Sequence, residues 1–211
     1  MVTSTPGDAL AAARIYFDCE GYAVLRGVLS PGEAALCADY ALLQSTDPEY
    51  FSEEPSLTAH GRYADALTEA LLVRILPMME RVHGAPLLPC YSYLRIYRRG
   101  AELPAHRDRP SCEISTSITL GFRGAARWPL WVGAKQGAIA LDLKPGDMLA
   151  YRGADLPHWR DCFEGELWVQ AFLHYVSADG EHAECRFDGR EHLGPFDPTR
   201  QHRKQKGGGG N

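Results

Sequence analysis

His106 and Asp108 stand two positions apart in the sequence, and His158 follows fifty residues after the aspartate. In an extended strand, residues i and i+2 project from the same face, so His106 and Asp108 can hold one ion while Arg107 points away. Two imidazoles and one carboxylate are the ligands of the 2-His-1-carboxylate triad, which binds Fe(II) and leaves coordination positions open for reactants. The spacing therefore predicts a metal site made of His106, Asp108 and His158.

The pattern also arises by chance, because the chain contains 8 histidines and 27 acidic residues. Its value depends on the elements that carry the three side chains. The first two ligands need a strand, and the third must come from the end of another strand of the same barrel or sheet.

Length and composition predict one soluble domain with a substantial core, since 211 residues contain 45% hydrophobic and 23% charged side chains. A net charge of −5 gives no indication of binding to nucleic acid or an anionic membrane. The longest apolar runs are too short to span a membrane, and residues 1–6 lack the features of a signal peptide, so we expect a cytoplasmic location. Six cysteines without a C-x-x-C pair favour free thiols, although one or two disulfides remain open.

The N-terminal third has helical patterns around one short strand at 22–26. Ser30, Pro31 and Glu33 form a capping box that begins the second helix. Pro77 should kink or split the third helix. Residues 46–62 are rich in Asp, Glu, Ser, Pro and Gly, which predicts a long loop that could act as a lid. The expected helices span 8–18, 31–44 and 64–83.

From residue 87 onward the pattern changes to short strands separated by turn residues. Together with the helices, this favours an α+β, mainly β fold: a β-barrel or jelly roll buttressed by N-terminal helices. We expect that domain to cover 1–177, followed by an irregular extension at 178–211 whose glycine-rich end is a disordered tail or, alternatively, a basic interaction arm. The expected strands span 90–98, 103–107, 112–121, 128–133, 138–143, 147–152 and 166–176.

Three segments resemble the Fe(II)/2-oxoglutarate-dependent dioxygenases, whose fold is a double-stranded β-helix, or jelly roll. Residues 16–30 are similar to the N-terminal helix and strand of phytanoyl-CoA dioxygenase relatives. The pattern Tyr97-x-x-Gly100-x-x-Leu103-x-x-His106-x-Asp108 resembles the approach to the metal motif in prolyl 4-hydroxylases. Residues 145–169, which include His158, resemble the turn, strand and distal histidine of the same hydroxylases.

This resemblance implies that His106, Asp108 and His158 bind Fe(II), that 2-oxoglutarate chelates the iron, and that O2 takes the last coordination position. It favours hydroxylation or another oxidation over halogenation, since Asp108 occupies the position where related halogenases have a small residue, and a hydroxylase is the expected enzyme. The partner would be a small-molecule or peptidyl substrate, with the oligomeric state left open.

One position departs from the resemblance. A Lys or Arg is expected shortly after the distal histidine to bind the far carboxylate of 2-oxoglutarate, but Leu167 stands there. Neither residue type occurs between Asp161 and Tyr175. A carboxylate buried without a cation is costly, so another group must meet it.

The candidates for this cofactor-binding role are Tyr97, Arg95 and Arg109. Tyr97 matches a tyrosine that helps to hold 2-oxoglutarate in prolyl 4-hydroxylases. Alternatively, it is an aromatic residue that only packs inside the barrel. Arg95 shares a face of its strand with Tyr97, and Arg109 follows the metal aspartate, where it could serve substrate or cosubstrate. Arg160 could reach an acidic substrate or only a surface carboxylate. The role of Gln170 depends on strand register.

Two other functions remain open at this stage. One is a metal-binding jelly roll without 2-oxoglutarate turnover, acting as a sensor or scaffold, which the leucine at 167 favours. The other is a redox-neutral metalloenzyme of cupin type, with Zn(II) or Mn(II) in the site.

Overall fold

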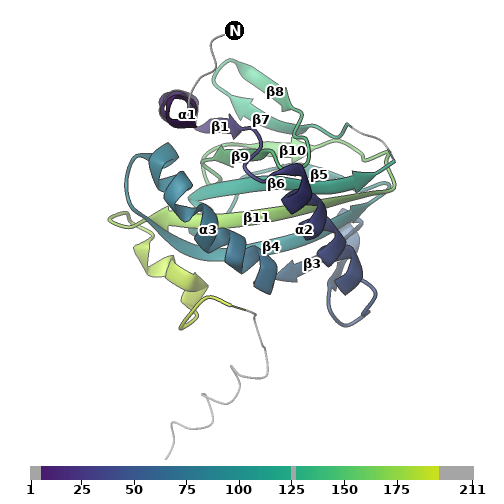
Figure 1. Cartoon of the computed structure of the whole chain (residues 1–211). Helices are drawn as coiled ribbons and strands as arrows, with labels where there is room; N and C mark the ends of the chain where they lie inside the picture. The colour runs from purple at the N-terminus through teal and green to yellow at the C-terminus, as the bar shows by residue number, and fades with distance from the viewer. Residues whose placement is uncertain (1–5, 125–126, 195–211) are drawn as a thin grey trace, which may run out of the picture.

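The strands form two antiparallel sheets that face each other, with helices on the outer face of the larger sheet (Figure 1). The computed structural model describes residues 6–124 and 127–194. The helices are α1 (Pro6–Glu20), α2 (Pro31–Gln44) and α3 (Ala66–His83). The strands are β1 (Tyr22–Leu25), β2 (Ser52–Glu54), β3 (Ala59–Tyr63), β4 (Leu87–Arg98), β5 (Leu103–His106), β6 (Ile114–Arg123), β7 (Leu130–Ala134), β8 (Gly137–Leu141), β9 (Met148–Tyr151), β10 (His158–Arg160) and β11 (Leu167–Ser177).

The larger sheet has seven strands in the order β1-β9-β6-β11-β4-β3-β2, and the smaller has four in the order β5-β10-β7-β8. This mainly β arrangement confirms the predicted jelly roll buttressed by N-terminal helices. Short 3₁₀ helices connect elements at Pro55–Leu57 and Pro110–Cys112, and a third covers Ala183–Gly189.

Capping residues determine where α2 begins and where α3 begins and ends. Ser30 and Glu33 make the predicted capping box of α2. The Asp65 carboxylate accepts from the first backbone amides of α3, and Gly84 ends that helix with a φ of 87°. Pro77 does not split α3, which is continuous. Burial of its apolar face, including the fully covered Leu72, offsets the hydrogen bond that proline removes.

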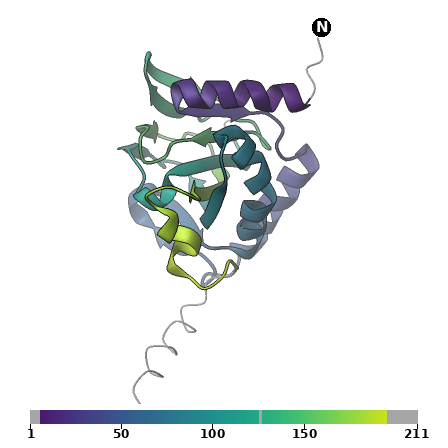
Figure 2. The ribbon, with the colours of Figure 1, turned by 90° about the vertical axis from the view of Figure 1, so that its left-hand side faces the viewer.

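The two faces of the larger sheet differ in chemistry because side chains alternate along each strand. On β11, Val169, Ala171 and Leu173 join the aliphatic core beneath α2 and α3, which cross in front of the sheet in Figure 1. Gln170 and Phe172 point to the other side, into the interior between the sheets. Figure 2 shows α1 along one end of the molecule, where it contacts β1 and α3.

The prediction of one long loop at residues 46–62 is wrong, because β2 and β3 lie there and extend the edge of the larger sheet. Ala59 to Tyr63 pair with β4, and Ser52 to Glu54 pair with β3. Gly61 leaves room there for the Tyr93 side chain, which would have to move if this position carried a Cβ. β3 was not recognised from the sequence because β4, its pairing partner, is distant in the chain and its residues lack the usual β-branched pattern.

The segment after β11 packs against the domain. Arg190 forms an ion pair with Glu69 at 3.2 Å, and their side chains are only 9% and 3% exposed. The predicted disordered tail or basic arm, from Arg200 onward, lies outside the described residues. Within the described ranges, no helix is long and apolar enough to cross a membrane.

Candidate metal centre

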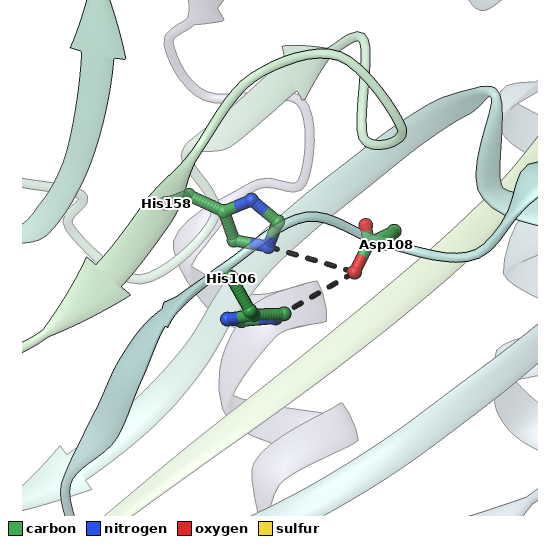
Figure 3. A group of neighbouring side chains, drawn as sticks. All are labelled: His106, Asp108 and His158. Atoms are coloured by element: carbon green, nitrogen blue, oxygen red, sulfur yellow. Dashed lines mark ion pairs between the residues drawn. The ribbon is translucent and has the colours of Figure 1, made fainter.

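His106, Asp108 and His158 meet at one end of the interior, as the spacing predicted (Figure 3). His106 ends β5 and His158 begins β10, and the two residues are direct partners in that antiparallel pair. The Nε2 atoms of both histidines lie 3.6 Å from Oδ1 of Asp108. Two ligands each about 2.1 Å from one ion can be no more than about 4.2 Å apart, so both distances allow shared coordination.

Backbone carbonyls orient both imidazoles in the same way. The Nδ1 atom of His106 lies 2.9 Å from the carbonyl oxygen of Pro104, and that of His158 lies 3.0 Å from the carbonyl oxygen of Leu156. With Nδ1 as the donor, Nε2 keeps the lone pair that a metal needs. Burial lowers the pKa of His158 in spite of the nearby carboxylate, which favours the neutral, ligating form.

Gly153 allows the Asp108 carboxylate to lie where it does, and sequence reasoning missed it. The Asp108 amide donates to the Gly153 carbonyl at 2.9 Å. A Cβ on Gly153 would lie 2.5 Å from Asp108 Oδ2 and 2.6 Å from Ser115 Oγ. Ser115 and Tyr151 each donate a long hydrogen bond of 3.4 Å to the same Oδ2. The sequence signal is a glycine two residues after a buried strand.

A second group of possible ligands, Asp108, Cys112 and His174, shares the aspartate with the first. Burial raises the pKa of Cys112 to about 11, so the thiol stays protonated at neutral pH and is a poor ligand. The Nδ1 atom of His174 lies 2.8 Å from the Ser115 hydroxyl. These contacts make His174 and Ser115 supports of Asp108 rather than a second centre.

The three candidate ligands line a pocket of about 450 Å³. Its apolar walls include Leu103, Leu130 and Phe172, and three tyrosines of β3 and β4 also line it. Three arginines also line the pocket, and they differ in how their charge is compensated. They are Arg95, Arg109 and Arg160.

Arg95 points into the pocket, as predicted from its register with Tyr97, but its guanidinium is already paired. Its Nε and Nη2 atoms donate to the Glu54 carboxylate at 2.7 and 2.9 Å, and Nη1 donates to the Tyr97 hydroxyl at 3.1 Å. Burial alone would lower the pKa of Arg95, yet Tyr97 and Glu54 outweigh it and the net shift is upward. Tyr97 itself is fully buried and contacts Trp128 edge to face.

Arg109 lies at the rim of the pocket and is also paired. Its Nη2 donates to Oδ2 of Asp188 at 3.0 Å, and its guanidinium lies over the Tyr91 ring. The Tyr63 hydroxyl donates to the same Asp188 oxygen at 2.6 Å. Asp188 belongs to the segment after β11, so that extension helps to build the rim, a role that no sequence pattern predicted.

Arg160 differs from both, because it is 2% exposed and forms no ion pair with any described residue. Leu167, at the position where a cation was expected, packs with the aliphatic core on the helix side of β11. Gln170, whose orientation depended on register, faces the interior and accepts from Arg160 Nη2 at 3.4 Å.

No protein-family description and no curated protein sequence matches the chain. Solved structures match it closely in shape. The non-heme alpha-ketoglutarate-dependent epimerase SnoN of nogalamycin biosynthesis has a TM-score of 0.70 at 14% identity, covering 93% of this chain and 98% of its own. The chain has the fold of that enzyme.

Two further structures extend the likeness. A Pseudomonas putida prolyl-4-hydroxylase has a TM-score of 0.65 at 13% identity, covering 80% of this chain and 98% of its own. HygX from Streptomyces hygroscopicus, solved with nickel and 2-oxoglutarate bound, has a TM-score of 0.62 at 14% identity, covering 87% and 95%. These likenesses confirm the jelly-roll architecture predicted from the sequence.

Proposed function

We propose that this chain is an Fe(II)- and 2-oxoglutarate-dependent oxygenase that hydroxylates a small-molecule substrate. The observation that carries the proposal is the convergence of His106, Asp108 and His158, with both Nε2 atoms directed at one carboxylate oxygen. A metal-ligand triad that opens into a pocket is what such chemistry requires. The resemblance to solved 2-oxoglutarate-dependent enzymes supports the same assignment.

Iron, 2-oxoglutarate and O2, when bound, supply an oxidant that can remove a hydrogen atom from an unactivated carbon. The residues of this chain supply position. His106 and His158 can direct Nε2 lone pairs at a metal because their Nδ1 atoms face backbone carbonyls. Asp108 is held by its own amide and by Ser115 and Tyr151. The apolar walls keep water from the reacting groups.

The substrate proposal rests on the size and lining of the pocket. A volume of about 450 Å³ lies within the range of about 300–1,000 Å³ typical of small-molecule sites. Tyr91 and Tyr63 stack at the mouth with ring centroids 5.4 Å apart, and Arg109 and Asp188 flank them. This lining suits a small molecule with an apolar or aromatic body and polar substituents.

Among the predicted cofactor-binding residues, we assign Arg95 and Arg109 to the substrate side of the pocket. Both guanidinium groups already have carboxylate partners, which reduces their attraction for another anion. Tyr97 supports Arg95 through its hydroxyl. A hydroxylase, rather than a halogenase, remains our proposal because Asp108 fills the coordination position that chloride would need.

Anaerobic titration tests the proposal. Fe(II) should bind one equivalent, and 2-oxoglutarate should then produce the weak visible charge-transfer band of a chelated keto acid. Addition of O2 should yield succinate. Iron binding without the band would instead favour a sensor or scaffold, and preferential retention of Zn(II) or Mn(II) would favour a cupin-type enzyme.

A further inference from the structure

Arg160 is a buried cation without a counter-charge among the described residues. Arg160 is 2% exposed, and none of the ion pairs between described residues includes it. A guanidinium that remains charged in such a place destabilises the fold unless something else neutralises it. An anion that binds in the pocket would do so.

The protein contacts of Arg160 hold the guanidinium in place without neutralising it. One Nη donates to the backbone carbonyl of Trp128, and the other donates to Gln170 Oε1 at 3.4 Å. The group lies over the Trp128 ring at 4.4 Å and the Trp168 ring at 5.3 Å. Arginine has five N–H donors, and these two hydrogen bonds leave donors for a ligand.

The position of Arg160 relative to the metal site follows from strand geometry. His158 and Arg160 are residues i and i+2 of β10, so they share a face, and both line the pocket. Two residues of a strand span about 6 to 7 Å. His158 is paired with His106, and Arg160 is paired with Leu103 across a shift in register. The arginine therefore lies two residues farther along β10 and opposite a residue three positions away on β5.

Ser117 adds a neutral donor to this end of the pocket. Its hydroxyl lines the pocket and accepts a hydrogen bond of 2.8 Å from Gln170 Nε2, so the hydroxyl hydrogen is free for an acceptor. The Gln170 amide thus contacts both Ser117 and Arg160, and fixes them relative to each other. A guanidinium and a hydroxyl presented together are typical of a carboxylate site.

We propose that Arg160, assisted by Ser117, binds the distal carboxylate of 2-oxoglutarate and replaces the cation that is missing at position 167. The inference rests on the proposed function and names the residues that would make this chain specific for a dicarboxylic keto acid. Three carbon–carbon bonds separate the keto carbon of that molecule from its far carboxylate. The ligand therefore has a length suited to the interval between a metal held by His158 and the guanidinium of Arg160.

The other two pocket arginines are weaker candidates on the same grounds. Arg95 already donates two hydrogen bonds to Glu54, and Arg109 donates to Asp188 at the rim. A keto acid bound to either would have to displace an existing carboxylate. Only Arg160, among the arginines that line this pocket, gains its first counter-charge from the ligand.

The test compares two keto acids on iron-loaded protein without O2. Binding is followed by the charge-transfer band for 2-oxoglutarate and for pyruvate, which has no distal carboxylate. Arg160→Met should lower the affinity for 2-oxoglutarate by at least about 30-fold, which is the usual scale for removing one partner of a buried charge pair. Its affinities for Fe(II) and pyruvate should stay within about threefold of wild type.

A neutral-pair variant serves as the matched control. Glu54→Gln with Arg95→Met removes both charges of the paired arginine, and its affinity for 2-oxoglutarate should remain within about threefold of wild type. If this double variant no longer binds 2-oxoglutarate and Arg160→Met still does, Arg95 binds the distal carboxylate and the inference is overturned. If wild type binds iron but forms the band with neither keto acid, the proposed function itself fails.

A second variant keeps the arginine and decides the matter if Arg160→Met does not fold. Gln170→Glu places a carboxylate beside Arg160 that competes with the ligand. The affinity for 2-oxoglutarate should therefore fall by about tenfold or more, while the affinity for pyruvate is unaffected. Unchanged 2-oxoglutarate affinity in Gln170→Glu would overturn the inference.

Discussion

Arg95 and Arg160 line the same pocket and differ in how their charge is compensated. Arg95 donates two hydrogen bonds to Glu54, and the net shift of its pKa is upward. Arg160 is more deeply buried, contacts a carbonyl, an amide and two indole rings, and has its pKa lowered to about 10. The difference indicates that one arginine completes the wall of the pocket, whereas the other is left for a ligand.

Substitution of a proposed metal ligand should have the largest effect on ligand binding, because the proposed role of either arginine depends on a metal bound nearby. His158→Ala removes one of three ligands and should weaken Fe(II) binding by more than about 100-fold, since supporting residues alone contribute 10- to 100-fold. Isothermal titration with Fe(II) under argon measures this. His60→Ala, on β3 and outside the pocket lining, is the control and should bind iron as wild type does.

Stability sharpens the comparison of the two arginines. Glu54→Gln leaves Arg95 without its counter-charge and should lower the free energy of unfolding by about 2–3 kcal/mol, less than the 3–5 kcal/mol of fully buried pairs because both side chains are nearly one-fifth exposed. Arg160→Met removes an uncompensated charge and should leave that free energy unchanged or raise it. Urea denaturation of the apoprotein compares them. Equal losses would contradict the distinction.

Gly153→Ala tests the support of the metal end without touching a ligand. The added methyl group must displace the Asp108 carboxylate or the Ser115 hydroxyl, so Fe(II) affinity should fall by about 10- to 100-fold. Gly32→Ala is matched to it, because a Cβ there meets nothing within 4 Å. Identical iron affinity in the two variants would show that Asp108 does not depend on this glycine.

The smallest effect is expected at the rim. Asp188→Asn removes the partner of Arg109, whose side chain is 53% exposed, and should change stability by less than about 1 kcal/mol. Thermal denaturation and the 2-oxoglutarate titration should both stay near wild type, while the KM for substrate rises. A loss of keto-acid binding would place the anchor at the rim and break the comparison.

The grouping of His106, Asp108 and His158 was predictable because it depends on local strand geometry. An i, i+2 pair on a strand fixes the relation of His106 to Asp108, and the turn residues before His158 indicate a neighbouring strand. The alternation along β11 likewise predicts one aliphatic face toward the helices. These features depend on residues close together in the sequence.

The compensation of charge was not predictable, because it depends on contacts between distant segments. Glu54 reaches Arg95 only because β2 and β3 form the sheet edge, and the sequence of that segment resembles a loop. Arg109 meets Asp188 through a chain reversal after β11. No local pattern distinguishes an arginine that will be paired from one that will not.

The position of β5 at the edge of the smaller sheet has a consequence for dynamics. This strand has four residues and, among the described strands, only β10 as its neighbour, so its amides should open more readily than those of β11, which lies between β4 and β6. An ion held by His106 and His158 would join β5 to β10 through their side chains. Iron loading should therefore slow hydrogen exchange in β5 and leave β11 almost unchanged, which makes the cofactor part of the scaffold that orients it.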